Sequence, residues 1–117
     1  MNKAEQTIQE RLAQELPQWS LEQGCLQRRY ATGGWRTSML LANGISHLAE
    51  VTWHHPDLEV SWGGVGVRLR THSEDAITDK DFELARMIED LVTWRPPKGS
   101  ALEGVPQQGP WRYLDGA

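Results

Sequence analysis

The chain has 117 residues, a formal net charge of −4 and one cysteine, so we expect a single domain held together by packing in a reducing compartment. No apolar run approaches the roughly 20 residues that cross a bilayer, and the N-terminal residues are too polar for a signal peptide. The acidic balance, without a lysine–arginine cluster, disfavours nucleic-acid and membrane partners, and we expect a cytoplasmic domain.

The N-terminal part of the chain predicts a helix followed by a β-hairpin. Residues 4–15 carry apolar side chains at helical spacing, and Pro17 ends this helix because proline biases the preceding residue out of the helical region. Two short strands, 19–21 and 26–30, follow on either side of a turn at Gln23-Gly24. The stripe that we expect this helix to bury consists of Ile8, Leu12 and Leu16.

Residues 35–53 form the longest periodic segment and predict a second helix, which Pro56 ends. It is apolar around much of its circumference, more than one sheet face covers, so we expect a homodimer or homotetramer. Gly44 would permit close approach of another helix. We expect one face to carry Met39, Ala42, Ile45 or Ser46, Ala49 and Trp53, and Leu40, Leu41 and Leu48 to widen it.

A second hairpin and a third helix complete the predicted domain. Residues 58–62 and 65–72 alternate as strands around Gly63-Gly64, and Thr78 begins a helix that runs to about residue 94. This order predicts an α+β fold, an antiparallel sheet covered on one face by helices. The inward side chains are expected to be Val65, Val67, Leu69 and Thr71 in the strand, and Leu84, Met87 or Ile88, and Leu91 in the helix.

We expect the domain to comprise residues 1–95 and residues 96–117 to form a separate extension. The extension is rich in proline and glycine, which disfavours a packed element. Leu102, Trp111 and Leu114 would be costly to leave in water. We therefore expect the extension to dock on its own domain or on a neighbouring subunit, outside the catalytic pocket.

Three of the four histidines lie between Glu50 and Asp81. Histidine exchanges protons near neutral pH, because its ordinary pKa is about 6.5. Pairing within the second hairpin brings His72 back toward His54-His55-Pro56, at one edge of the sheet. Asp81 then opens the next helix within reach of an imidazole, and Glu50 lies one helical turn before the first histidine. These residues predict a proton-transfer site.

Other interpretations of the polar motifs are weaker. Adjacent His54 and His55 diverge, and without a nearby cysteine their spacing disfavours zinc. Each of these histidines could instead be an ordinary polar residue at the end of an element, and we expect His47 to be a surface residue. The glycine cluster at 63–66 is not the dinucleotide fingerprint, because the last glycine of that motif and the helix that follows it are missing. Cys25 has no base nearby in sequence, and we expect a buried or idle thiol.

The spacing Glu50-x-x-x-His54-His55-Pro56, with Trp62, His72 and Asp81 following, resembles the signature of the pterin-4a-carbinolamine dehydratases. The resemblance implies a four-stranded antiparallel sheet with three helices on one face, and a dimer or tetramer. It implies dehydration of 4a-hydroxytetrahydropterin to quinonoid dihydropterin, with no metal or organic cofactor. One departure is Ala76-Ile77-Thr78, where the family often has glycine at the first of these positions.

The resemblance also implies a role for each site residue. His54 and His72 would transfer protons and His55 would hold the pterin, while Asp81 would orient His72 and Glu50 would support the His54 side. Relatives of these enzymes also act as coactivators or as Rubisco assembly factors of carboxysomes, so a catalytically silent binding protein is the alternative. The residues that the resemblance places at the substrate are Pro56, which fixes the turn, Trp62, as an aromatic wall, and Thr71.

Overall fold

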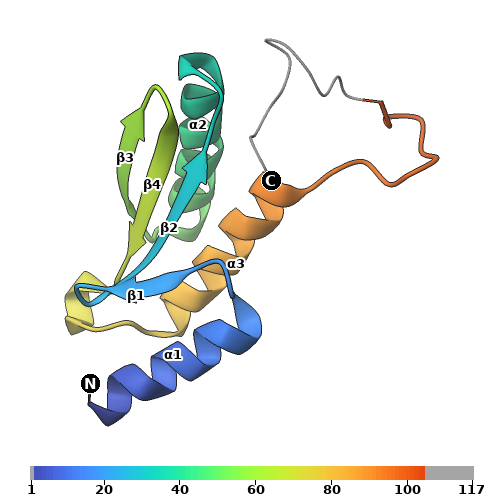
Figure 1. The fold of residues 1–117 in the computed structure, drawn as a ribbon. Coiled ribbons are helices and arrows are strands. Elements are labelled where there is room, and N and C mark those ends of the chain that lie inside the picture. Colours follow the sequence, from blue (N-terminus) through green and yellow to red (C-terminus); the bar gives the residue numbers. More distant parts are fainter. Residues whose placement is uncertain (1, 105–117) are drawn as a thin grey trace.

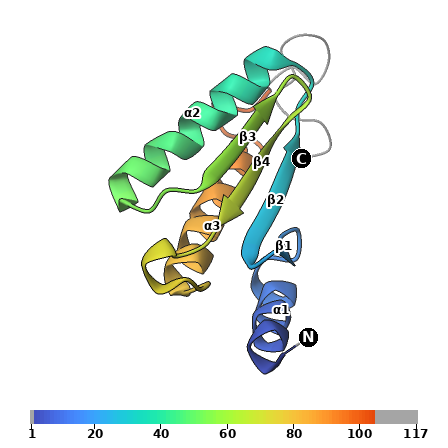
Figure 2. The ribbon, with the colours of Figure 1, turned by 90° about the vertical axis from the view of Figure 1, so that its left-hand side faces the viewer.

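The computed structural model describes residues 2–104 and contains one four-stranded antiparallel sheet with three helices, which confirms the predicted α+β fold. The strand order is β1-β2-β4-β3. The helices lie on one side of the sheet, and its other face is uncovered (Figures 1 and 2). The elements are α1 (Lys3–Glu15), β1 (Ser20–Glu22), β2 (Cys25–Ala31), α2 (Trp35–Thr52), β3 (Asp57–Ser61), β4 (Gly64–Leu69), the 3₁₀ turn η1 (His72–Glu74) and α3 (Asp79–Thr93).

The hydrophobic core lies between the sheet and the helices. Alternate residues of the central strand β4 face it, as predicted, because side chains alternate between the two faces of a strand. The predicted stripe of α1 is also confirmed, with its last two leucines buried. Cys25 is buried and unpaired. The largest fully buried apolar side chains are Tyr30, Leu16, Leu26, Leu41, Ile45, Leu69, Ile88, Val65, Val67 and Val92.

The predicted inward face of α2 was wrong at several positions. Leu41 is 1% exposed and faces the core, whereas Met39 and Trp53 are exposed. The stripe shifts because Ser38 is fully buried, with its hydroxyl hydrogen-bonded to Thr32 at 2.6 Å. A prediction that places only apolar residues in the core does not place Ser38 there, so the predicted buried face of α2 is rotated relative to the real one. The buried face of α3 is also rotated from the predicted one. Val92 and Phe82 are buried, whereas Leu91 and Met87 are exposed.

Gly44 faces α3 of the same chain. A Cβ atom at Gly44 would lie 3.1 Å from Cδ2 of Leu91, so the missing side chain lets α2 and α3 approach closely. The predicted role of Gly44 in contact with another subunit is therefore replaced by an intrachain one. Leu41 is also unavailable to another subunit, because it belongs to the core, but Leu40 remains exposed.

The second hairpin is shorter than predicted. Ser61 pairs with Gly64, so the two-residue turn is Trp62-Gly63 and not the predicted Gly63-Gly64. Strand β4 ends at Leu69, before the predicted end at residue 72. Thr71 instead forms an isolated bridge with Ala76, which turns the chain back toward α3.

A buried carboxylate ties the first hairpin to α3. Oε1 of Glu89 accepts hydrogen bonds from Nε1 of Trp19 at 2.8 Å, the hydroxyl of Tyr30 at 2.7 Å and Nε of Arg28 at 3.2 Å. Burial opposes ionisation of Glu89, but the hydrogen bonds from Arg28, Tyr30 and Trp19 outweigh it and lower its pKa. Burial and the nearby carboxylate raise the pKa of Tyr30. These bonds fix the sheet against the helix that carries Asp81.

The C-terminal extension is described only as far as residue 104. Leu102 is 75% exposed, so the expected docking of this side chain on its own domain is not found. Trp111 and Leu114, the other residues of that prediction, lie outside the described residues. Across residues 2–104, no helix is both long enough and apolar enough to span a membrane.

Candidate active site

The end of α2 sets the direction of the two adjacent histidines. Trp53 adopts a left-handed conformation, with φ of 52°, and its N–H donates to the carbonyl of Glu50. The N–H of His54 donates to the carbonyl of Ala49 at 3.2 Å. This pair of bonds is the Schellman arrangement that ends many helices. The chain therefore leaves α2 abruptly, and Pro56 follows just before β3 begins.

His54 is held by a buried carboxylate from a different element. Its Nε2 lies 2.7 Å from Oδ1 of Asp81, which is in the first turn of α3. The Asp81 side chain is 0% exposed and the His54 side chain is 14% exposed. The contact joins the C-terminal end of α2 to the N-terminal end of α3. Figure 2 shows both helix ends, the start of β3 and the η1 turn gathered at one end of the sheet.

The other oxygen of Asp81 is also occupied. Oδ2 accepts hydrogen bonds from the Thr71 hydroxyl at 2.8 Å and from the backbone N–H of Thr78 at 2.9 Å. Thr78 and Asp81 thus form a capping box at the predicted start of α3. Because Thr71 donates to Asp81, the Thr78 hydroxyl donates to Thr71, 2.7 Å away. Both oxygens of the Asp81 carboxylate therefore have hydrogen-bond partners.

This network sets the protonation pattern of His54. Oδ2 of Asp81 accepts from two donors, Thr71 and Thr78, and an ionised carboxylate offers His54 only an acceptor at Oδ1. Nε2 of His54 therefore carries the hydrogen, and Nδ1 of the neutral ring has a free lone pair. A carboxylate that fixes the tautomer of an imidazole in this way prepares its other nitrogen to accept a proton.

His55 forms a second, more exposed pair. Its Nε2 lies 2.6 Å from Oε2 of Glu50, and its ring meets Trp53 edge to face with centroids 4.9 Å apart. About half of the His55 side chain remains exposed. A shallow groove of about 320 Å³ adjoins this pair, lined by Ser46, Ala49, Glu50, His55, Pro56 and Leu58.

The carboxylate partners differ from those implied by the resemblance. Asp81 binds His54 and not His72, and Glu50 binds His55 and not His54. His72 lies at the same end of the sheet, one residue after Thr71, but it is exposed. Within residues 2–104 its ring has no hydrogen-bond partner.

Thr71 and Trp62, which the resemblance places at the substrate, do not line the groove beside His55. Thr71 is buried and its hydroxyl is engaged with Asp81. Trp62 lies at the hairpin tip, where its carbonyl accepts from Thr32 and Ser38 near the start of α2. The 18 residues of α2 span about 27 Å, so this ring is far from His54 in the same subunit. Sequence reasoning missed the supporting role of Thr71, although the capping box beside it was a usable signal.

The remaining polar residues do not enlarge the site. His47 is exposed on α2, as predicted. Among residues 2–104, no three histidine, cysteine, aspartate or glutamate side chains gather as a metal-binding group. A larger concavity, of about 590 Å³, lies on the uncovered face of the sheet and includes none of the histidines.

The fold and the site together define a small α+β protein with two histidine–carboxylate pairs at one end of its sheet. The sequence profile of the family described as pterin 4 alpha carbinolamine dehydratase matches residues 2–91. The chain therefore belongs to the pterin-4-alpha-carbinolamine dehydratase family, which confirms the resemblance seen in the signature.

Curated relatives agree with this assignment. A protein of Aquifex aeolicus, provisionally named a pterin-4-alpha-carbinolamine dehydratase, is 42% identical over 79 residues, covering 68% of this chain and 80% of that protein. A protein of Streptomyces coelicolor with the same provisional name is 40% identical over 88 residues, covering 74% of this chain and 86% of that protein.

Two solved structures share the fold. One, from Brucella melitensis, is described as a transcriptional coactivator/pterin dehydratase; it superimposes with a TM-score of 0.65 at 24% identity, covering 78% of this chain and 96% of that one. The other is described as a pterin dehydratase-like RuBisCO assembly factor of the α-carboxysome. It superimposes with a TM-score of 0.53 at 17% identity, covering 64% of this chain and 87% of that one. At these identities the likeness concerns the fold alone.

Proposed function

We propose that this protein dehydrates 4a-hydroxytetrahydropterin to quinonoid dihydropterin, in the recycling of a tetrahydropterin. The observation that carries the proposal is the His54–Asp81 pair, in which a fully buried carboxylate fixes the tautomer of a partly exposed imidazole. The curated relatives bear the name of this activity. The family match also covers the end of the sheet that carries His54, His55, His72 and Asp81, which we call the histidine corner.

The reaction needs one proton to be removed and one to be supplied. The N5–H bond of the substrate breaks and its electron pair forms the N5=C4a double bond. The C4a–O bond breaks with its pair on oxygen, which takes a proton and leaves as water. Proton transfer by a positioned side chain typically contributes about 10²–10⁴-fold to such a step. In our proposal Nδ1 of His54 accepts the N5 proton, and His72 protonates the leaving oxygen.

The groove beside His55 supports a place for the pterin. Its volume of about 320 Å³ is at the lower end of the range for small-molecule sites. We assign to His55 and Pro56 the role of holding the ring, with Glu50 orienting the His55 imidazole. Within one subunit Trp62 is too distant to serve as the aromatic wall, so Trp62 has no part in this proposal.

A silent binding protein is the alternative function. The His54–Asp81 pair favours the enzyme, because proton transfer uses an imidazole oriented by a buried carboxylate, whereas binding a partner does not require one. We further propose a cytoplasmic homodimer or homotetramer. Its contact would use an exposed apolar patch across α2 and α3, which contains Leu40, Met87, Leu91 and Trp94.

The proposed function is tested by adding the purified protein to chemically generated 4a-hydroxytetrahydropterin and following absorbance at neutral pH. We expect the dehydration to be faster than in buffer, and to remain so after dialysis against EDTA. A rate equal to that of buffer would refute the enzyme and favour the binding protein. Loss of activity on chelation, with stoichiometric metal in the untreated protein, would refute our assignment of the site residues.

A further inference from the structure

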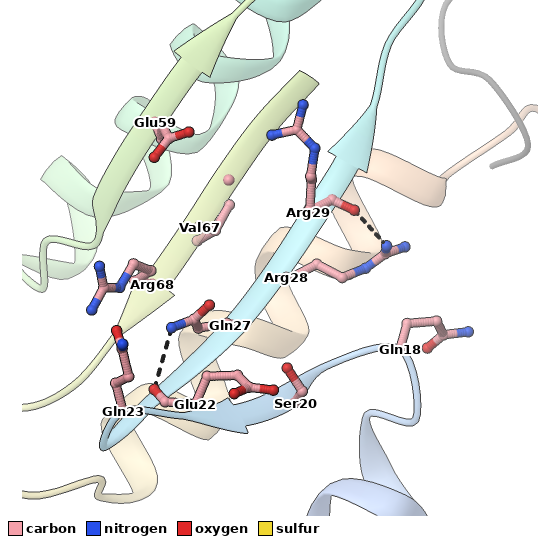
Figure 3. A pocket seen from close by; sticks show the side chains of 11 residues that line it. Gln18, Ser20, Glu22, Gln23, Gln27, Arg28, Arg29, Glu59, Val67 and Arg68 are labelled. Atoms are coloured by element: carbon pink, nitrogen blue, oxygen red, sulfur yellow. Dashed lines mark hydrogen bonds between the residues drawn. The ribbon is translucent and has the colours of Figure 1, made fainter. Parts of the chain in front are cut away.

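The uncovered face of the sheet carries a concavity larger than the groove beside His55. It measures about 590 Å³ and is distinct from the histidine corner. Figure 3 shows its polar side chains standing on β1, β2, β3 and β4. The residues that line it are Gln18, Ser20, Glu22, Gln23, Gln27, Arg28, Arg29, Glu59, Gly66, Val67 and Arg68.

Positive charge is concentrated at the centre of this surface. Arg29 stands on β2 and Arg68 on β4, the two central strands. Arg29 pairs directly with Gly66, so Arg68 lies two residues along the neighbouring strand and on the same face. Within residues 2–104 neither guanidinium has an ion-pair or hydrogen-bond partner, whereas Arg28 is paired with Glu89.

Two glycines leave the outward side of β4 without side chains next to Arg29. Gly64 and Gly66 occupy the outward positions of β4, where other residues would project side chains. A Cβ atom at Gly64 would lie 2.7 Å from a terminal nitrogen of Arg29, so only glycine lets this guanidinium lie against β4. The result is a strip of β4 without side chains, in which Gly64 is buried next to the Arg29 guanidinium and Gly66 is half-buried.

Negative charge lies on the two edge strands, and it includes Asp57 of β3, which is directly opposite Arg68. Glu22 lies on β1 and Glu59 on β3, the two edge strands of the sheet. Amide side chains occupy the space between, with Gln27 donating to the carbonyl of Glu22 at 3.2 Å (Figure 3). A ligand that fits must place its anionic groups on the central strip and its hydrogen-bond donors at the margins.

We propose that this face docks an extended, acidic segment of a partner protein, with Arg29 and Arg68 as its anchors. Arginine binds carboxylates through paired, charge-assisted hydrogen bonds, and the backbone N–H groups of a peptide suit the glutamates at the rims. A nucleic-acid strand fits less well, because its regularly spaced phosphates would meet Glu22 and Glu59 and the chain is acidic overall. This proposal does not depend on the dehydratase activity.

The test is an amide NMR titration of ¹⁵N-labelled full-length protein with the peptide Gly-Ser-Glu-Ser-Glu-Ser-Gly. We expect saturable shifts centred on residues 27–29 and 66–68. The double variant Arg29→Gln/Arg68→Gln should bind at least tenfold more weakly, and a peptide with glutamine in place of glutamate should not bind. The control Lys3→Gln/Lys98→Gln removes the same charge away from this face and should bind as the wild type does.

Several results would overturn the proposal. They are absence of shifts at millimolar peptide, shifts centred elsewhere, equal affinity in the arginine double variant, and equal affinity for a single-stranded DNA of matched length. The arginine substitutions are on the surface, and the amide spectrum itself reports whether the fold is intact. The dehydration rate of the double variant should equal that of the wild type, so failure of the docking surface is distinguishable from failure of the proposed function.

Discussion

Asp81 and His54 are 27 residues apart in the chain, yet their side chains meet at 2.7 Å. The same carboxylate closes the capping box of its own helix, so one buried group both begins α3 and orients the imidazole at the end of α2. Stability and the proposed chemistry are therefore coupled at this residue, and they can be separated by comparing variants.

Asp81→Asn should reduce the dehydration rate at least tenfold, because an amide cannot accept from three donors as the carboxylate does. It should also lower the free energy of unfolding by about 1–3 kcal/mol, the usual cost of a broken buried hydrogen bond. Steady-state kinetics and urea denaturation measure the two effects.

The matched control for Asp81 is Thr78→Ala. This change removes the N-cap hydroxyl, at a cost of about 0.5–2 kcal/mol, but leaves the His54–Asp81 contact in place. Its rate per folded molecule should stay near that of the wild type. If Thr78→Ala and Asp81→Asn lose activity equally, the carboxylate acts only through the helix cap.

His55→Ala should raise KM by about three- to tenfold, the effect of one lost hydrogen bond, and change kcat less. The expectation follows from the position of His55 beside the groove and away from Asp81. Glu50→Gln should have a smaller effect, since the Glu50–His55 pair is exposed and such pairs contribute about 0–1 kcal/mol. A fall in kcat with unchanged KM for His55→Ala would place this residue in proton transfer instead.

Glu89 should make the protein sensitive to acid. Its pKa is lowered in the folded state, so its contribution to stability is present above its unfolded pKa of about 4.3 and is lost as pH falls through the folded value. Urea denaturation of Glu89→Gln should therefore show a smaller loss of stability below pH 4.3 than the wild type shows, with a stability about 1–3 kcal/mol lower at pH 7.

Asp90→Asn serves as the comparison for Glu89, because Asp90 is an exposed carboxylate of the same helix, paired with Arg86 at 3.5 Å. It should leave the acid response unchanged. An acid response identical in the wild type and Glu89→Gln would mean that the buried cluster is not the group that titrates.

Light scattering at micromolar concentration should report a dimer or tetramer. Leu40 and Leu91 are both exposed, and Leu91 lies against Gly44, one helical turn after Leu40. A charge at either position should weaken an apolar contact between subunits, so Leu40→Glu and Leu91→Glu should shift the protein toward monomer. Leu102→Glu, an equally radical change at an exposed leucine outside the helices, should not. A 13.3 kDa monomer in the wild type would contradict the proposed assembly.

The sequence was sufficient for the order of elements and for the position of the histidine corner. Period-2 and helical spacing, the capping residues Thr78 and Asp81, and the proline at 56 are local signals, and local signals are what periodicity detects. The burial of Val65, Val67 and Leu69 followed from alternation alone.

Contacts between side chains of different elements were harder to predict from the sequence. Asp81 reaches His54 because the capping box turns its carboxylate toward the end of α2, while the η1 turn leaves His72 exposed. No spacing along the chain encodes that choice. Trp62 follows β3, and a five-residue strand carries its next residue about 17 Å from the start of that strand, a separation that the motif spacing does not reveal.

The most direct test of the account compares wild type and His54→Ala in the dehydration of 4a-hydroxytetrahydropterin at neutral pH, with circular dichroism to confirm that both are folded. We expect the wild type to accelerate the reaction and His54→Ala to lose at least tenfold of that rate, because the imidazole fixed by Asp81 is the proposed base. A folded His54→Ala variant with the wild-type rate would contradict the central claim.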